Sequence, residues 1–324
     1  MPVRQAHIVF YNADARLEGT LYTPSTNQPV PALVALQDAS VGLATAALYR
    51  HLRTALPAIG IAVLLFDRRG SGASTGSAKR ATYETLADDG IAGARAIAKR
   101  PGIDRTRIGY WGVSQGGWLA LLATTRDPST AFVISVSAPL VTPATQMEFA
   151  MANRLRVLGY PQNDVAAMLT ARRAWSGFAG GTVPRATAVA ALATIDQKPW
   201  FDQMYLPSAS QVPNDPTATT WRKHMNEDPF GTISHVRVPA LLIFGGEDPW
   251  IPVRTTLARV ESIVRTHPNI SYAVVPGASH EMMLKLSPQA SMSTDKQTLL
   301  TIAPDAPMYF ALLSSWLTRH VLAK

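Results

Sequence analysis

The sequence predicts an α/β fold in which a mostly parallel sheet is covered by helices on both faces. Short apolar runs, typical of strands buried on both sides, occur in the first part of the chain and again near its end. Helical apolar spacing separates most of these runs, and strands that alternate with helices form parallel sheets. Residues 139–235 show helical patterns without a strong strand run. We therefore predict a core domain from residues 1–138 and 236–324, with a helical cap (139–235) inserted after the sixth strand.

The first strands follow from alternation and then from continuous apolarity. Residues 7–12 and 15–24 partly alternate apolar and polar side chains, which predicts a strand pair at the start of the chain. Residues 31–38 and 61–67 are nearly continuous apolar runs, as expected of strands inside a sheet. A helical pattern over residues 44–59 connects these two strands.

The next elements repeat this alternation. A helix is predicted over residues 82–99, because a Pro-Gly pair follows as a stop signal. A strand over residues 107–114 leads into a helix over 116–125, and a further strand occupies 131–138.

Inside the predicted cap, helical patterns cover residues 146–158, 163–175 and 184–195, and the irregular stretch PSASQVPNDPTATT follows. After the cap, the chain returns to strand and helix patterns. These are a strand over 239–248, a helix over 253–265, a strand over 270–277 and a closing helix over 306–322.

Composition narrows the class of protein. The chain has 324 residues, 47% of them hydrophobic, and no cysteine, so disulfides and thiolate metal sites are excluded. Its net charge is +8, but the basic residues are scattered and no nucleic-acid-binding motif accompanies them, so we expect no nucleic-acid partner. No apolar run is long enough for a membrane helix, and the first ten residues lack the apolar core of a signal peptide. We therefore expect a cytoplasmic protein that binds no membrane.

The segment GYWGVSQGGW carries the strongest functional signal. Gly112-Val113-Ser114-Gln115-Gly116 fits G-x-S-x-G between a predicted strand and a predicted helix, the context in which this motif holds a nucleophilic serine on a strained turn. The alternative is an ordinary glycine-containing turn, so the assignment depends on partners for the serine. At such a turn the N–H of Gln115, the first of the helix, would point toward a developing oxyanion.

Two later residues suit the partner roles. A serine nucleophile needs a base, and the base needs an acid that orients it, in the chain order serine, acid, histidine. Asp248 ends the strand ALLIFGGED, and His280 lies in the loop after the next strand. Asp248 could instead only cap a helix, Glu247 could replace it as the acid, and His280 could be a surface histidine. The order and location of all three favour Ser114, Asp248 and His280.

With these residues placed, the chain resembles an α/β-hydrolase, specifically the esterase and peptidase branch that includes dienelactone hydrolases and prolyl oligopeptidases. The stretch LLFDRRGSGASTG is similar to the loop that follows the fourth strand in that branch. The resemblance implies that Asp67, Arg69 and Gly70 brace a tight turn. A phosphate-binding loop is the rival interpretation, but the stretch lacks the P-loop lysine and the G-x-G-x-x-G spacing.

The second oxyanion donor departs from the family pattern. Family members often carry His-Gly after the third strand, where this chain has Gln37-Asp38. The resemblance implies that the backbone N–H of Ala39 supplies the donor, since an N–H is present whatever the side chain. The charge of Asp38 would oppose a developing oxyanion unless it is paired or turned away.

The resemblance implies acyl transfer through an acyl-enzyme on Ser114, with small to medium carboxylic esters as substrates because a cap would hinder access of a polypeptide. A peptidase or amidase, a thioesterase, an acyltransferase and a non-catalytic binding protein of the same fold remain alternatives. No metal or organic cofactor is expected, and a homodimer is left open. Some aromatic residues of the cap are candidates for the substrate pocket, although packing of the cap onto the sheet is the favoured role for most of them: Trp175, Trp200, Tyr205 and Trp221.

Overall fold

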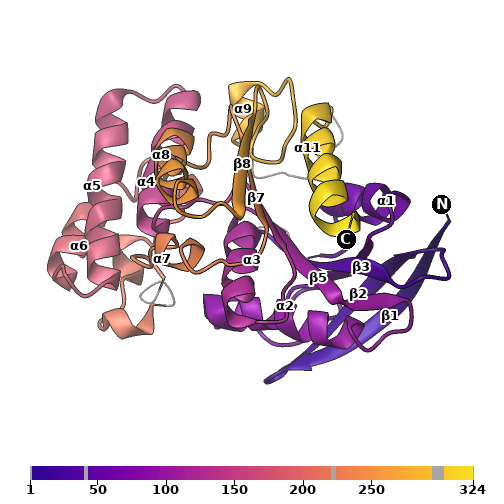
Figure 1. Ribbon diagram of the computed structural model, residues 1–324. Coiled ribbons are helices and arrows are strands. Elements are labelled where there is room, and N and C mark those ends of the chain that lie inside the picture. Colours follow the sequence, from indigo (N-terminus) through magenta and orange to yellow (C-terminus); the bar gives the residue numbers. More distant parts are fainter. Residues whose placement is uncertain (1, 40–42, 220–223, 294–302, 324) are drawn as a thin grey trace.

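The computed structural model describes residues 2–39, 43–219, 224–293 and 303–323. It contains an eight-stranded sheet with the order β1-β2-β4-β3-β5-β6-β7-β8, and neighbouring strands are parallel from β4 to β8 (Figure 1). β1 and β2 form an antiparallel hairpin, and β2 pairs antiparallel with β4. The strands are β1 (Val3–Asn12), β2 (Ala15–Pro24), β3 (Val30–Leu36), β4 (Ala62–Phe66), β5 (Ile103–Val113), β6 (Val133–Val136), β7 (Ala240–Gly245) and β8 (Ile270–Val275).

Helices cover both faces of the sheet, as predicted. One apolar cluster joins the sheet to α2, α3 and α8, and a second joins its other face to α1 and α11. The strand β3 is buried along its whole length, which explains why its sequence VPALVAL has no polar residue. These helices are α1 (Arg50–Ala58), α2 (Tyr83–Ile97), α3 (Gln115–Arg126), α8 (Val253–Val264) and α11 (Pro307–Leu317).

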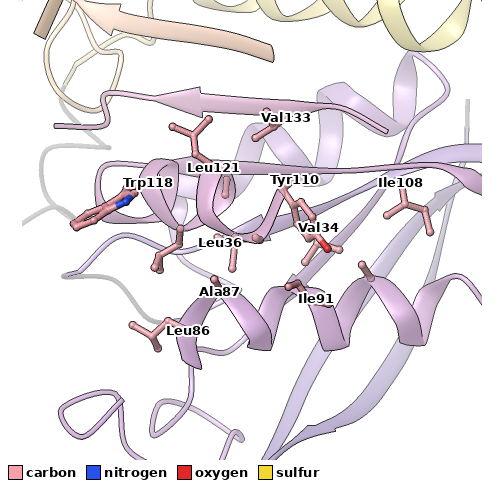
Figure 2. Packing of buried hydrophobic residues seen from close by; sticks show 14 of the residues in the cluster. Val34, Leu36, Leu86, Ala87, Ile91, Ile108, Tyr110, Trp118, Leu121 and Val133 are labelled. Atoms are coloured by element: carbon pink, nitrogen blue, oxygen red, sulfur yellow. The ribbon is translucent and has the colours of Figure 1, made fainter. Parts of the chain in front are cut away.

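Figure 2 shows the packing of the first face, where side chains of α2 and α3 meet those of the strands. Ala87 and Ile91 of α2 lie against the row that contains Val34, Leu36 and Tyr110. This packing fixes α3 against β5 and β3, and α3 begins directly after Ser114.

The described part of the segment between β6 and β7 contains helices, short 3-10 turns and irregular stretches, and no strand. α4 (Pro143–Val157), α5 (Gln162–Ala179) and α6 (Arg185–Ala193) pack around their own apolar cluster and lie together at one side of the sheet (Figure 1). The short helix α7 (Phe230–Ile233) leads back to β7. We call residues 139–235, the range of the predicted cap, the helical segment.

α4 contacts the loop that follows β7. The side-chain amide of Asn153 donates to the carbonyl oxygen of Pro249 over 3.1 Å, and that of Gln146 donates to Trp250 over 3.1 Å. The helical segment is therefore bonded to the loop that contains Asp248.

Two predicted helices are α-helical over only part of their predicted length. The helix predicted over 44–59 is helical only from a 3-10 turn at Ala47–Tyr49 into α1. In the structure, the N–H of Ala44 donates to the carboxylate of Asp67, and its carbonyl accepts from the guanidinium of Arg53. The closing helix changes after α11 into a π-helix at Thr318–Leu322.

Within the described residues, no helix combines the length and the apolarity that crossing a membrane requires.

Candidate active site

Ser114 occupies a strained turn between β5 and α3. Its backbone has φ 57° and ψ −125°, a conformation that is costly for a residue with a side chain. Its N–H donates to the carbonyl oxygen of Val136 over 2.8 Å, which extends the pairing of β5 with β6 up to the turn. The half-buried serine therefore lies at the carboxyl edge of the sheet, immediately before the N-terminus of α3.

The two glycines of the motif are required by close contact between backbones. A Cβ atom on Gly112 would overlap the carbonyl oxygen of Gly116, and one on Gly116 would overlap the carbonyl oxygen of Leu36. The turn is therefore packed against the end of β3, and neither position has room for a larger residue.

Asp248 and His280 form a buried hydrogen-bonded pair. Nδ1 of His280 lies 2.6 Å from Oδ2 of Asp248, and the two side chains are 7% and 0% exposed. The other carboxylate oxygen of Asp248 accepts from the N–H groups of Trp250 and Ile251 at 2.8 and 3.3 Å. Asp248 thus caps the following turn, as the alternative interpretation expected, and also binds the imidazole.

The three residues follow strands that are close neighbours. Ser114 follows β5, Asp248 follows β7 and His280 follows β8, and only β6 lies between β5 and β7. Two strand spacings amount to roughly 10 Å, a gap that the imidazole on the loop after β8 is suited to bridge. Within the described residues, the hydroxyl of Ser114 makes no hydrogen bond with His280. Such bonds are often long in enzymes without substrate.

The competing acid is turned to solvent. Glu247 is exposed, whereas its neighbour Asp248 is buried and bonded to the imidazole. Of the other histidines, His224 belongs to the helical segment and stacks on Tyr83 with 4.0 Å between the ring centroids.

Both predicted oxyanion donors are available. Gln115 is the first residue of α3, and Ala39 is an exposed residue after β3. In the described part of the chain, neither backbone N–H donates a hydrogen bond to another protein group. The structure does not contradict the assignment of Ala39, which remains a prediction.

Arg68 is the residue that sequence reasoning missed beside these donors. Its Nη1 donates to the backbone oxygen of Asp38 over 2.7 Å, and its Nη2 donates to Oε1 of Gln115 over 2.6 Å. Burial lowers the pKa of Arg68, and the charge of Asp38 opposes that shift. The charge of Asp38 therefore has a cationic neighbour, as the departure from His-Gly required. The only sequence signal was an arginine directly after a buried strand and Asp67.

The loop that contains Arg68 is braced by its neighbours, as the resemblance implied. The carboxylate of Asp67 accepts from the N–H groups of Ala44 and Ala73 at 2.9 and 3.0 Å. Arg69 is 3% exposed and binds the buried Asp89 through Nε and Nη2 at 2.8 and 2.6 Å. Gly70 has a φ of 75°, which favours glycine.

The predicted pocket aromatics lie in different environments. Trp175 and Trp200 are 7% and 0% exposed and belong to the apolar cluster of the helical segment. Tyr205 is 55% exposed, and Trp221 lies outside the described residues. The two buried tryptophans thus have a packing role in the helical segment, and Tyr205 is open to solvent.

No group of three or more His, Asp or Glu side chains within the described ranges is arranged to hold a metal ion. The polar groups at the carboxyl edge of the sheet are instead a hydroxyl, an imidazole, a carboxylate and backbone N–H groups, which are the groups that acyl transfer uses.

Comparison with proteins of known sequence gives relatives of several activities. The chain is 25% identical over 222 residues to a thiohydrolase, aneE, of Aspergillus aculeatus, a match that covers 63% of this chain and 65% of the thiohydrolase. It is 31% identical over 136 residues to a probable dipeptidyl-aminopeptidase B of Uncinocarpus reesii, a match that covers 40% of this chain and 14% of the peptidase. The chain thus matches less than two thirds of the length of either relative.

Solved structures share the fold at low sequence identity. The Pyrococcus furiosus esterase Pf2001 has a TM-score of 0.64 and 15% identity, with 98% of this chain and 92% of the esterase covered. The acylaminoacyl peptidase of Pyrococcus horikoshii has a TM-score of 0.60 and 17% identity, with 99% of this chain and 42% of the peptidase covered. The model of the alpha/beta hydrolase family matches residues 39–290, which is most of the sequence. The chain belongs to the alpha/beta hydrolase family.

Proposed function

We propose that the protein is a serine hydrolase that cleaves carboxylic esters of small to medium size through an acyl-enzyme on Ser114. The observation that carries the proposal is the buried bond between His280 and Asp248, at the same sheet edge as the strained Ser114. In a catalytic triad, the buried carboxylate holds the imidazole ring in one orientation next to the nucleophile.

The mechanism assigns one task to each group. The Nδ1–H of His280 donates to Asp248, so Nε2 is the nitrogen that takes the proton of Ser114 when its oxygen attacks the ester carbonyl. The resulting oxyanion accepts from the N–H groups of Gln115 and Ala39. Collapse of this intermediate breaks the ester bond, and the imidazolium protonates the departing alcohol. His280 then takes a proton from water, whose oxygen attacks the acyl-enzyme. Collapse of this second intermediate breaks the bond to Ser114, and the imidazolium returns its proton to the serine oxygen as the acid leaves.

The helical segment serves in this proposal as a cap over the site. Its α4 is hydrogen-bonded to the loop after β7 that carries Asp248. A cap held in this way favours small and medium substrates over folded proteins. Of the pocket candidates that the structure describes, Tyr205 is open to solvent.

A fluorophosphonate probe tests the nucleophile. We expect it to label the protein on Ser114 and to abolish ester hydrolysis, whereas Ser114→Ala should be neither labelled nor active. Ser210→Ala, on an exposed serine of the helical segment, is the matched control and should behave like the parent. No labelling of the parent protein, together with full activity of Ser114→Ala, would reject the proposal.

Thioester hydrolysis is a second candidate, favoured by the match to a thiohydrolase over 63% of this chain. Peptide or amide cleavage and acyl transfer would use the same residues. Rates should be compared on an ester, a thioester and an anilide that share one acyl group. We expect the ester to be fastest, and a faster anilide would reassign the protein as an amidase. Tight binding of a small ligand without turnover would instead indicate a binding protein.

A further inference from the structure

The side chain of Arg68 connects the two segments that carry the predicted oxyanion donors. Arg68 follows β4, and its guanidinium reaches the loop after β3 at one end and the first residue of α3 at the other. The two bonds, of 2.7 and 2.6 Å, come from the two terminal nitrogens of one planar group. A planar fork with two bound ends fixes the separation of the two acceptors better than two independent side chains could.

The bond to Asp38 sets the direction of the N–H of Ala39. The peptide between Asp38 and Ala39 is trans, so its carbonyl and its N–H point in opposite directions. Arg68 holds the carbonyl, and the N–H of Ala39 is therefore aimed away from the guanidinium. The N–H of Asp38, one residue earlier, bonds to the hydroxyl of Tyr49 over 3.2 Å, which restrains the other side of the same residue.

The bond to Gln115 acts on the second segment. Gln115 carries the first N–H of α3, and its side-chain oxygen accepts from Arg68. The residue that supplies one donor is thus held through its side chain, and its backbone N–H makes no bond to another described group.

The position of the charge adds to the geometric argument. Arg68 is partly buried, and its Nε has no hydrogen-bond partner in the described residues. Keeping a cation there costs free energy, because burial disfavours the charged form and lowers the pKa of Arg68. A positive charge next to Asp38 offsets the negative charge that would otherwise oppose the oxyanion.

We propose that Arg68 is a positioning residue that builds the oxyanion hole, by holding the carbonyl of Asp38 and the side chain of Gln115 so that the N–H groups of Ala39 and Gln115 converge. This inference rests on the proposed serine hydrolase function. Arg68 does not touch the substrate in this role and takes no proton.

The test is the rate of fluorophosphonate labelling, which requires no knowledge of the natural substrate because phosphonylation of Ser114 also uses the oxyanion hole. Loss of an oxyanion donor costs about 100- to 1,000-fold in rate, and a displaced donor should cost less. For Arg68→Met we expect labelling and kcat to fall about 10- to 100-fold, with KM changed less than about threefold. A boronate that forms a tetrahedral adduct should bind more weakly by a similar factor.

Two further variants separate positioning from a general loss of structure. Arg68→Lys keeps the charge but cannot make the fork, so its rate should lie between those of Arg68→Met and the parent. Gln115→Leu keeps the backbone N–H and removes only one end of the bridge, so it should be affected less than Arg68→Met. Arg80→Met, an exposed arginine of the same loop region, is the matched control and should behave like the parent. If Arg68→Met does not fold, the lysine and leucine variants decide the question.

The outcomes distinguish the two proposals. No labelling of the folded parent would reject the serine hydrolase, and with it this role for Arg68. A labelled parent, with folded Arg68→Met labelled within about twofold of it, would reject only the role of Arg68. Loss of substrate and boronate affinity by the same factor, with kcat unchanged, would instead assign Arg68 to ground-state binding.

Discussion

The sheet and the helical segment bury arginine in different ways. Beside the sheet, Arg69 is 3% exposed and binds the buried carboxylate of Asp89 with two nitrogens, while Nη1 binds Asp14 at 3.1 Å. In the helical segment, Arg172 is 2% exposed, donates through Nη2 to the carbonyl of Met204 and has no partner for Nε among the described residues. Burial lowers the pKa of Arg172 to about 10.

The difference teaches what each buried charge contributes to the fold. Arg69 and Asp89 compensate each other, so removing one leaves the other charge buried without its partner. Among the described residues, the carbonyl of Met204 and the charge of Glu148 offset the burial of Arg172, so removing the guanidinium also removes a burial cost. The sheet region should therefore depend strongly on Arg69, and the helical segment only weakly on Arg172.

The largest effect is expected for Arg69→Met. The variant leaves the carboxylate of Asp89 with only the side-chain amide of Asn12, at 2.7 Å, and breaking such a pair costs about 3–5 kcal/mol. The free energy of unfolding in urea measures this loss. Arg126→Met is the control, because its pair with Asp88 is more than a third exposed and should contribute at most about 1 kcal/mol. Equal losses of unfolding free energy in the two variants would contradict the proposed importance of the buried pair.

A second prediction concerns His51, a half-buried histidine of the sheet region. Its ring is surrounded by Trp111, Tyr309 and Phe310, and Nε2 lies 2.9 Å from the hydroxyl of Tyr309. Burial lowers the pKa of His51 from 6.5 to about 3. The unfolded chain therefore binds a proton below pH 6.5 that the folded chain does not, and stability should fall between pH 6.5 and 3.

His51→Gln should remove this part of the acid sensitivity. The slope of stability with pH that one such histidine contributes is at most about 1.4 kcal/mol per pH unit. Urea unfolding at several pH values measures it, and His235→Gln, on an exposed histidine, is the control. An unchanged slope in His51→Gln would show that the ring is protonated in the folded protein.

The smallest effect is expected for Arg172→Met. The apolar side chain fits the surrounding cluster of the helical segment and removes the unpartnered Nε, but it leaves the carbonyl of Met204 without its donor. These changes oppose each other, so the free energy of unfolding should change by about 1 kcal/mol or less. A loss as large as that of Arg69→Met would mean that Arg172 is fully compensated in the folded protein.

Much of the fold could be predicted because each buried strand has a characteristic local sequence pattern. β3 and β4 are buried on both faces, so their sequences are continuous apolar runs. The turn at Ser114 also has a local sequence pattern, because close backbone contact leaves room only for glycine on either side of it. The pairing of His280 with Asp248 agrees with the predicted order, while the convergence of all three residues on a substrate remains a prediction.

The rest depends on contacts between distant segments, which no local pattern reveals. Arg68 reaches across from β4 to Asp38 and Gln115, and a lone arginine after a strand does not specify its partners. The predicted helix over 44–59 began late, and Asp67 and Arg53 bind the backbone of Ala44 ahead of it. The environments of Trp200 and Tyr205 were likewise set by how the helical segment packs on itself.

The positive φ of Ser114 has a consequence for the history of this chain. A residue with a Cβ loses about 1–3 kcal/mol in such a conformation, and glycine would lose much less. Serine at this position thus lowers the stability of the fold. A related protein that no longer turned over substrate would become more stable if glycine replaced it. Glycine at position 114 in related chains would accordingly mark those that have given up chemistry and retained only the scaffold.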